Sequence, residues 1–181
     1  STYQLPRPFM VLATQNPLEY EGTHPLPESQ LDRFLLRIRI GYPATGDEKT
    51  ILRGAGVPSP DALEPVVAVD DVLALQEDAD RVRAEEPLLD YVMALVAATR
   101  ASPLLALGVS PRGALALLRA ARAAALADGR DYVVPDDVKA LAVPALAHRV
   151  LLKSGAGRPG ERGVDAEAVL TSITQQVSVP R

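Results

Sequence analysis

Hydrophobic and polar positions predict two strands of different burial within the first forty residues. Residues 9 to 13 form an uninterrupted apolar run before Thr14-Gln15-Asn16-Pro17, which is typical of a strand buried on both faces and ended by a turn. Residues 35 to 40 alternate, with apolar side chains on one face and Arg37 and Arg39 on the other, as in a half-exposed edge strand. Between them, residues 27 to 34 have room for two helical turns.

Two such strands cannot by themselves complete a parallel sheet that is covered on both faces. No other convincing strand follows in the sequence, so we expect the remaining strands to precede Ser1. The first residue is also not methionine. We therefore expect the chain to be the C-terminal part of a longer protein, cut inside a domain.

From Tyr42 onward the periodicity is helical, with proline and glycine marking where helices begin and end. The expected helix starts are a capping box at Thr45 to Glu48, an N-cap at Asp70, Pro87, an N-cap at Ser110 before Pro111, Pro135, and a weak last helix over 164 to 177. The expected stops and connections are Gly54 or Gly56, a loop over 57 to 68, Asp128-Gly129, and an interruption at Pro144.

These signals divide the chain into three parts. Residues 1 to 41 carry the two strands and the short helix, residues 42 to 155 form a helical domain, and residues 156 to 181 form a flexible glycine-rich hinge and a tail that contains the last helix. We find no internal repeat. The expected fold class is therefore mostly α.

Composition excludes several classes of function. Nineteen basic against 23 acidic residues give a net charge of -4, without the basic footprint that general nucleic-acid binding needs. The absence of cysteine and the presence of only two histidines, far apart, give no spacing typical of a metal site, and we expect no metal held by protein ligands alone. No apolar run approaches the roughly 18 residues of a membrane span, so we expect a cytoplasmic protein.

Asn16 and Arg33 are candidate phosphate-handling residues. Asn16 directly follows the predicted buried strand, and ligands of open α/β sheets bind outside the carboxyl ends of the strands. Its amide can orient a water or a phosphate oxygen, although asparagine before proline is also simply typical of a turn. Arg33 ends the short helix, where it can stabilise a transferring phosphoryl group, or instead act as a helix-terminal cation or a partner of Asp32.

Arg112 is unusual on physical grounds because it places a cation in the first turn of a helix, against the helix dipole. A bound anion would reverse the sign of that interaction. The first turn of the same helix offers free backbone N–H groups, so residues 110 to 113 can present both a dipole and a guanidinium to a phosphate. The alternative is an arginine that extends into solvent.

The sequence lacks a phosphate-binding loop of its own. Residues 46 to 50, Gly-Asp-Glu-Lys-Thr, contain Lys-Thr but no glycine directly before the lysine, and they lie inside an expected helix. His24 and His148 are isolated in the sequence and are expected to be structural.

Several segments together resemble the MoxR family of AAA+ ATPases over about residues 5 to 153. The segments are Ala-Thr-Gln-Asn-Pro, Glu-Gly-Thr, Pro-Leu-Pro-Glu, Gln-Leu-Asp-Arg-Phe and Gly-Tyr-Pro, followed by Ala-Thr-Arg, Gly-Val-Ser-Pro-Arg, Gly-Arg-Asp-Tyr-Val, Pro-Asp-Asp-Val and His-Arg-Val. His24 and Ser29 depart from the family pattern, where tyrosine and alanine are expected. The resemblance implies an all-helical AAA+ lid domain preceded by a remnant, two strands and a short helix, of the α/β P-loop NTPase core.

The resemblance also assigns roles to the three candidates. It implies that Asn16 is sensor 1, that Arg33 is the arginine finger acting on a neighbouring subunit's nucleotide, and that Arg112 is sensor 2 on the lid. The family's Walker A and Walker B segments, which supply most of the contacts to ATP and Mg²⁺, precede sensor 1 and have no counterpart in this sequence. The chain alone is therefore expected to be inactive.

By the same resemblance, the complete protein is expected to form a homo-oligomeric ring, a hexamer, that hydrolyses ATP. It would remodel or assemble protein complexes or insert cofactors into them, working with clients that include von Willebrand factor A domain proteins. A non-enzymatic helical adaptor derived from a lid is the alternative from another class of protein. A DNA-acting ATPase is a third reading, which the acidic composition disfavours.

Overall fold

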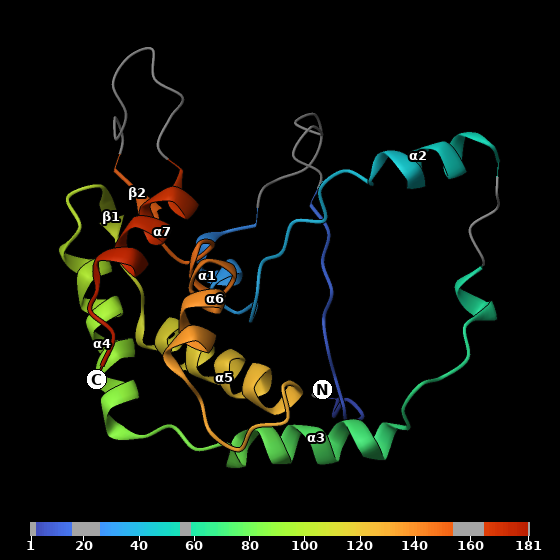
Figure 1. Ribbon diagram of the computed structural model, residues 1–181, viewed down its shortest axis with the longest axis horizontal. Coiled ribbons are helices and arrows are strands. Elements are labelled where there is room, and N and C mark those ends of the chain that lie inside the picture. Colours follow the sequence, from blue (N-terminus) through green and yellow to red (C-terminus); the bar gives the residue numbers. More distant parts are fainter. Residues whose placement is uncertain (1–2, 16–25, 55–58, 154–164, 181) are drawn as a thin grey trace.

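The computed structural model describes residues 3–15, 26–54, 59–153 and 165–180. This part of the chain is predominantly helical, as predicted (Figure 1). Its helices are α1 (Glu28–Leu31), α2 (Thr45–Leu52), the 3-10 turn η1 (Pro60–Ala62), α3 (Val69–Arg81), α4 (Glu86–Ala101), α5 (Pro111–Ala127), α6 (Pro135–Leu146) and α7 (Ala166–Gln176). Two short strands are β1 (Leu105–Leu107) and β2 (Leu151–Leu152).

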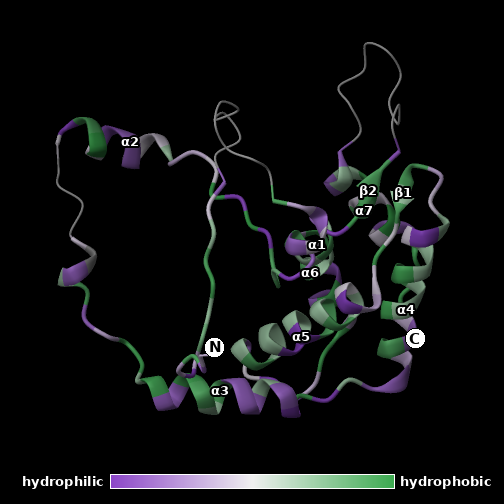
Figure 2. Cartoon of the chain, turned by 180° about the vertical axis from the view of Figure 1, so that it is seen from behind, coloured by the Kyte–Doolittle hydropathy of each residue, from purple (hydrophilic) through white to green (hydrophobic). Residues whose placement is uncertain are grey.

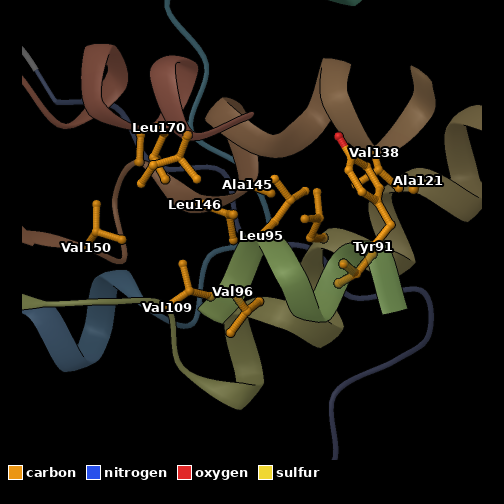
Figure 3. Packing of buried hydrophobic residues seen from close by; sticks show 14 of the residues in the cluster. Tyr91, Leu95, Val96, Val109, Ala121, Val138, Ala145, Leu146, Val150 and Leu170 are labelled. Carbon is orange, nitrogen blue, oxygen red and sulfur yellow. The ribbon is translucent and has the colours of Figure 1, made fainter. Parts of the chain in front are cut away.

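The hydrophobic core lies among α4, α5, α6 and α7 (Figure 3). Val96 of α4, Leu117 of α5 and Val138 of α6 have no exposed surface, and Leu170 of α7 is almost as buried. Each side chain of this kind contributes roughly 1.5 to 3 kcal/mol when it is removed from water. Alanines such as Ala121 complete the cluster and allow α5 and α6 to pack closely.

The predicted limits of α5 are confirmed. Ser110 is the N-cap, and its Oγ accepts a hydrogen bond from the N–H of Gly113 at 3.1 Å. Pro111 occupies the first turn, where its missing N–H costs nothing. Asp128 is the C-cap, and Gly129 follows with φ +75°, a conformation that glycine adopts without strain.

Two predicted caps are wrong by one or two residues. Ala44 is the N-cap of α2 and Thr45 already belongs to the helix, so the predicted capping box at Thr45 to Glu48 is not formed. Ala68 rather than Asp70 is the N-cap of α3. There the carboxylate of Asp71 accepts a hydrogen bond from the backbone N–H of Ala68 at 2.9 Å. This hydrogen bond satisfies the N–H of the N-cap residue, which has no partner within the helix.

Pro144 lies inside α6 and does not interrupt it, contrary to the prediction. The helix extends only two residues further, to Leu146, so one missing N–H affects a single helical hydrogen bond. Ala145 and Leu146 are buried in the core, and their packing favours continuation of the helix. The carbonyl of Pro144 accepts the backbone N–H of Arg37 at 2.8 Å, which joins α6 to the segment after α1.

The strand predictions for residues 9 to 13 and 35 to 40 are wrong for the part of the chain that the structure describes. Neither segment forms a strand, and both expose apolar side chains; Leu12, for example, is 84% exposed. A strand needs a neighbouring strand for its ladder of backbone hydrogen bonds, and among the described residues neither segment pairs with one. In Figure 2 the first of them runs as an extended trace beside the helical body.

Two strands that we did not predict do form. β1 and β2 pair antiparallel, Leu105 with Leu152 and Leu107 with Leu151, with an irregularity between the two pairs. Segments of two or three residues carry too little periodicity to be recognised in a sequence. Their pairing brings the segment after α4 next to the segment after α6.

The last predicted helix is confirmed as α7, and it is part of the core. Val169, Leu170 and Ile173 are buried, and the helix packs against α4 and α6. At its start, Glu167 binds both Arg37 and Arg39, the latter at 2.8 Å, so the two arginines share one side as their alternation predicted. The domain limits at 41/42 and 155/156 stay predictions.

The segment that carries α2 and η1 extends away from this helical body (Figures 1 and 2). Its exposed apolar residues include Ile51, Leu52 and Val66. Within the described ranges, no helix is both long enough and apolar enough to cross a membrane.

Candidate functional site

Arg112 lies in the first turn of α5, two residues after the N-cap Ser110. Its side chain is 60% exposed, and its Nη1 lies 3.5 Å from Oδ2 of Asp32. A guanidinium at this end of a helix faces the positive end of the dipole, so an anion beside it is stabilising. In the structure that anion is the carboxylate of Asp32.

Asp32 is the C-cap of α1 and connects three side chains of the helical domain. Its Oδ1 accepts from Oγ of Ser110 at 3.3 Å and from Nε of Arg149 at 3.1 Å, while Oδ2 faces Arg112. The carboxylate is thus near the start of α5, where helix dipole and hydroxyl both favour negative charge. Sequence reasoning considered Asp32 only as a partner of Arg33.

Arg149 is a central residue of the site that sequence reasoning did not single out. Its side chain is 2% exposed. The guanidinium donates to the backbone carbonyls of Asp32 at 3.1 Å, Phe34 at 2.6 Å and Leu35 at 3.2 Å, and also to the carbonyl of Ala145. The only signal in the sequence was its place in the His-Arg-Val segment.

Burial lowers the pKa of the Arg149 guanidinium, and the neighbouring Asp32 carboxylate opposes that change. The guanidinium nevertheless remains charged, because arginine is not deprotonated in proteins. A buried charge needs a partner and several hydrogen bonds to be tolerated, and the turn at residues 32 to 35 supplies both. This turn, which follows α1, is therefore fixed to the end of α6.

His148 fixes the same turn from a second direction. Its Nε2 lies 2.9 Å from the carbonyl oxygen of Phe34, so Nε2 carries the hydrogen and donates it. Nδ1 is buried and has no hydrogen-bond partner among the described residues. Burial lowers the pKa of the imidazole. These contacts fit the structural role that we expected for this histidine.

Arg33 lies between two anchored residues, Asp32 and Phe34. Its backbone N–H donates to the carbonyl of Gln30 at 3.1 Å, and the residue itself is exposed. Within the described ranges its guanidinium makes no hydrogen bond or ion pair, and Asp32 is paired with Arg112 and Arg149 instead. The structure thus holds the backbone around Arg33 firmly and leaves its side chain at the surface.

Of the three predicted site residues, Arg112 and Arg33 lie in the described ranges, and Asp32 links Arg112 to the backbone that carries Arg33. Arg112 reaches the carboxylate of Asp32, the residue directly before Arg33. Asn16 and His24 lie outside the described residues, and Ser29 is exposed on α1. Among the described residues, no group of three or more His, Asp or Glu side chains is placed to hold a metal ion.

Arg130 and Asp137 form a second charged cluster, which supports the start of α6. Arg130 donates from both terminal nitrogens to the carboxylate of Asp137, at 2.8 and 2.7 Å. The same carboxylate accepts the N–H of Val134 at 2.8 Å. These hydrogen bonds, chiefly the one from Arg130, lower the pKa of Asp137. The cluster closes the connection between α5 and α6 and has a structural role.

Comparison with known proteins gives two family matches. Residues 1–36 match the ATPase family associated with various cellular activities (AAA), and residues 97–173 match the AAA lid domain. The first match ends at residue 36, directly after the turn at residues 32 to 35 that carries Arg33. The second match begins in α4 and includes Arg112, Arg149 and most of α7.

Individual relatives agree with these matches. Over 99% of its length the chain is 47% identical to the uncharacterized protein YeaC of Bacillus subtilis and 40% identical to the chaperone MoxR1 of Mycobacterium tuberculosis, covering 55% and 49% of those proteins. The chain is also similar to a crystal structure of a candidate ATPase from Cytophaga hutchinsonii, with a TM-score of 0.88 and 34% sequence identity. The similarity covers all of this chain and 57% of the chain in that crystal structure. The chain thus spans about half the length of the relatives it matches. These similarities show that it belongs to the MoxR-type AAA+ ATPases and corresponds to their C-terminal region.

Proposed function

We propose that the chain supplies sensor 1, the arginine finger and the helical lid to an ATPase that couples ATP binding and hydrolysis to the remodelling, assembly or cofactor loading of protein complexes. One observation carries this proposal. Arg112, in the first turn of α5, contacts the carboxylate of Asp32, and Arg33 is the residue directly after Asp32, in the turn that follows α1. An exposed guanidinium in a helix's first turn is suited to a phosphate.

In this proposal the two arginines act on different nucleotides. Arg112 binds the γ-phosphate of its own subunit's ATP, and Arg33 reaches the γ-phosphate held by the neighbouring subunit. Asn16 orients the attacking water or a phosphate oxygen. Because each site needs a residue from the next subunit, hydrolysis requires a closed ring, and we propose a hexamer.

Phosphate-loop and magnesium-binding residues have to come from the other part of the complete protein. The 181 residues contain no Walker A pattern, and an arginine finger stabilises a transition state only when the phosphates and Mg²⁺ are already held. We therefore propose that the chain alone does not turn over ATP. We also propose that the complete protein acts in the cytoplasm on client proteins, including proteins with a von Willebrand factor A domain.

Mixed rings of the complete protein test the proposal. Arg33→Ala is expected to leave ATP binding intact and to lower turnover by roughly 10³-fold or more, the range measured for arginine fingers. Adding subunits that lack the Walker A lysine but keep Arg33 is expected to restore part of the turnover. Arg81→Ala is the matched control, because the ion pairs of this exposed arginine among the described residues lie within α3. Mixed rings that form without any rescue would contradict action across the interface.

A further inference from the structure

We propose that Thr99 and Arg100, in the last turn of α4, are positioning residues that set the place of Arg112 at the start of α5. This role rests on the proposed function in one respect, because it requires that Arg112 binds the γ-phosphate of ATP. The role is the same whichever subunit of the ring holds that nucleotide.

The hydroxyl of Thr99 holds the backbone N–H of Val109. Oγ1 of Thr99 donates to the carbonyl of Val96 at 2.7 Å and accepts from the N–H of Val109 at 3.1 Å. The donation to Val96 orients the hydroxyl and leaves a lone pair of its oxygen for the Val109 N–H. Thr99 is 1% exposed, and a buried N–H that loses its partner is costly. The fold therefore depends on this contact.

Arg100 holds the other polar backbone group of the same residue. Its Nε donates to the carbonyl of Val109 at 3.0 Å. The side chain of Val109 is buried in the hydrophobic core (Figure 3). The N–H and the carbonyl of Val109 are thus fixed by two consecutive residues of α4, and its side chain is fixed by the core.

Gly108 allows the chain to lie directly on α4 at this point. A Cβ at residue 108 would be 2.7 Å from both the Cα and the backbone N of Arg100, so a larger residue would push the segment away from the helix. Residues 108 and 109 therefore have a defined position on the last turn of α4.

Little conformational freedom remains between Val109 and Arg112. Ser110 caps α5 with its side chain, and Pro111 has a fixed φ in the first turn of the helix. The position of Val109 on α4 thereby determines where the guanidinium of Arg112 begins. Because a misplacement of about 1 Å can lower activity roughly 10²-fold, this position is expected to control phosphate binding.

Thr99→Val in the complete protein tests this role. Valine has a similar shape but cannot accept from the Val109 N–H. We expect it to weaken the binding of a non-hydrolysable ATP analogue about five- to tenfold and to leave the affinity for ADP, which lacks the γ-phosphate, within about twofold of its original value. A variant that only damaged the fold would weaken the binding of both nucleotides alike.

Thr99→Ser keeps the hydroxyl and is expected to retain the preference of the natural sequence for the ATP analogue over ADP. If Thr99→Ser lowered this preference as much as Thr99→Val, the hydroxyl would not be responsible, and the positioning role would be wrong.

A double-mutant cycle with Arg112→Ala shows whether Thr99 acts through Arg112. The lower preference for the ATP analogue is expected in the presence of Arg112 and absent in the Arg112→Ala background. An equal loss in both backgrounds, or no loss with Arg112 present, would overturn the positioning role while leaving the proposed function in place. If Arg112→Ala does not itself lower the preference, the sensor role in the proposed function fails, and the positioning role fails with it.

Two further variants complete the experiment. Arg100→Ala removes the hydrogen bond to the Val109 carbonyl from an exposed side chain, so it is expected to fold even if Thr99→Val does not. It is expected to lower the same preference about two- to fivefold, again only in the presence of Arg112. Thr174→Val is the matched control, because the hydroxyl of Thr174 donates to the carbonyl of Leu170 within α7. An equal loss of preference with Thr174→Val and Thr99→Val would also overturn the role.

Discussion

Arg149 and Asp32 are in direct contact, with Nε of the guanidinium 3.1 Å from Oδ1 of the carboxylate, although 117 residues separate them in the sequence. This contact joins the turn after α1 to the end of α6. It thereby fixes the position of the proposed arginine finger relative to the helical domain that carries the proposed sensor.

Replacing Arg149 by alanine is expected to destabilise the chain strongly. The change leaves Asp32 and the carbonyl of Phe34 without their main donor in a largely buried setting, and removal of one partner of a buried ion pair costs about 3 to 5 kcal/mol. Urea unfolding measures the effect. Arg81→Ala, which removes an arginine from exposed pairs, is expected to cost at most about 1 kcal/mol. Similar losses for the two variants would contradict a special role for Arg149.

His148 is expected to make stability depend on pH. Burial lowers its folded-state pKa, so below about pH 6.5 the unfolded chain binds more protons than the folded chain and stability falls. The histidine's contribution is complete above the unfolded pKa and is lost as the pH falls toward the folded pKa.

Unfolding free energies measured between pH 7.5 and 5.5 test this dependence. His148→Gln, whose amide can still donate to Phe34, is expected to flatten the curve. His24→Gln is the control, because His24 is the other histidine of the chain. If the pH dependence disappeared with His24→Gln and persisted with His148→Gln, it would arise from His24 and the prediction would be wrong.

Asp137 is expected to add a second pH dependence at lower pH. Its pKa is lowered, so its contribution is present above the ordinary aspartate pKa of about 3.9 and is lost as the pH falls through the folded value. Asp137→Asn is expected to be less stable than the natural sequence at pH 7, with a difference that shrinks as the solution becomes acidic. Asp136→Asn, at an exposed neighbouring position, is the comparison. A difference that stays constant down to pH 3 would contradict the assignment.

Gly108 and Gly46 provide a matched pair of alanine substitutions. A Cβ at Gly108 would lie 2.7 Å from the backbone Cα and N of Arg100, which cannot move aside easily. Gly108→Ala is expected to cost about 1 to 3 kcal/mol through overpacking. A Cβ at Gly46, inside α2, would meet nothing within 4 Å, and alanine favours a helix, so Gly46→Ala is expected to be neutral or slightly stabilising. Thermal unfolding compares the two, and a reversed order would show that the close approach at Gly108 is unimportant.

Local signals in the sequence predicted the helices well, because caps, prolines and periodicity act within a few residues. Ser110-Pro111 and Asp128-Gly129 marked both ends of α5. The predicted strands failed because the backbone hydrogen bonds of a strand come from neighbouring strands, which no local pattern reveals. Residues 9 to 13 have no such neighbour among the described residues. Pro144 was misjudged because core packing around Leu146 outweighs one lost hydrogen bond.

The candidate site was predictable only in part. Arg112 could be singled out from its position in the first turn of a helix alone, and the structure gives it an anionic partner. Arg149 was not predicted because its role depends on its burial and on hydrogen bonds to carbonyl groups more than one hundred residues away in the sequence. No local pattern distinguishes such an arginine from one on the surface, and only the three-dimensional contacts assign it to the site.

A structure of the complete protein, assembled into its ring and loaded with a non-hydrolysable ATP analogue, tests the proposed roles of the three residues. We expect Arg112 and Asn16 to lie within about 3 Å of the γ-phosphate in their own subunit and Arg33 to reach the γ-phosphate of the neighbouring subunit. A ring in which these three side chains lie far from every γ-phosphate would contradict these roles.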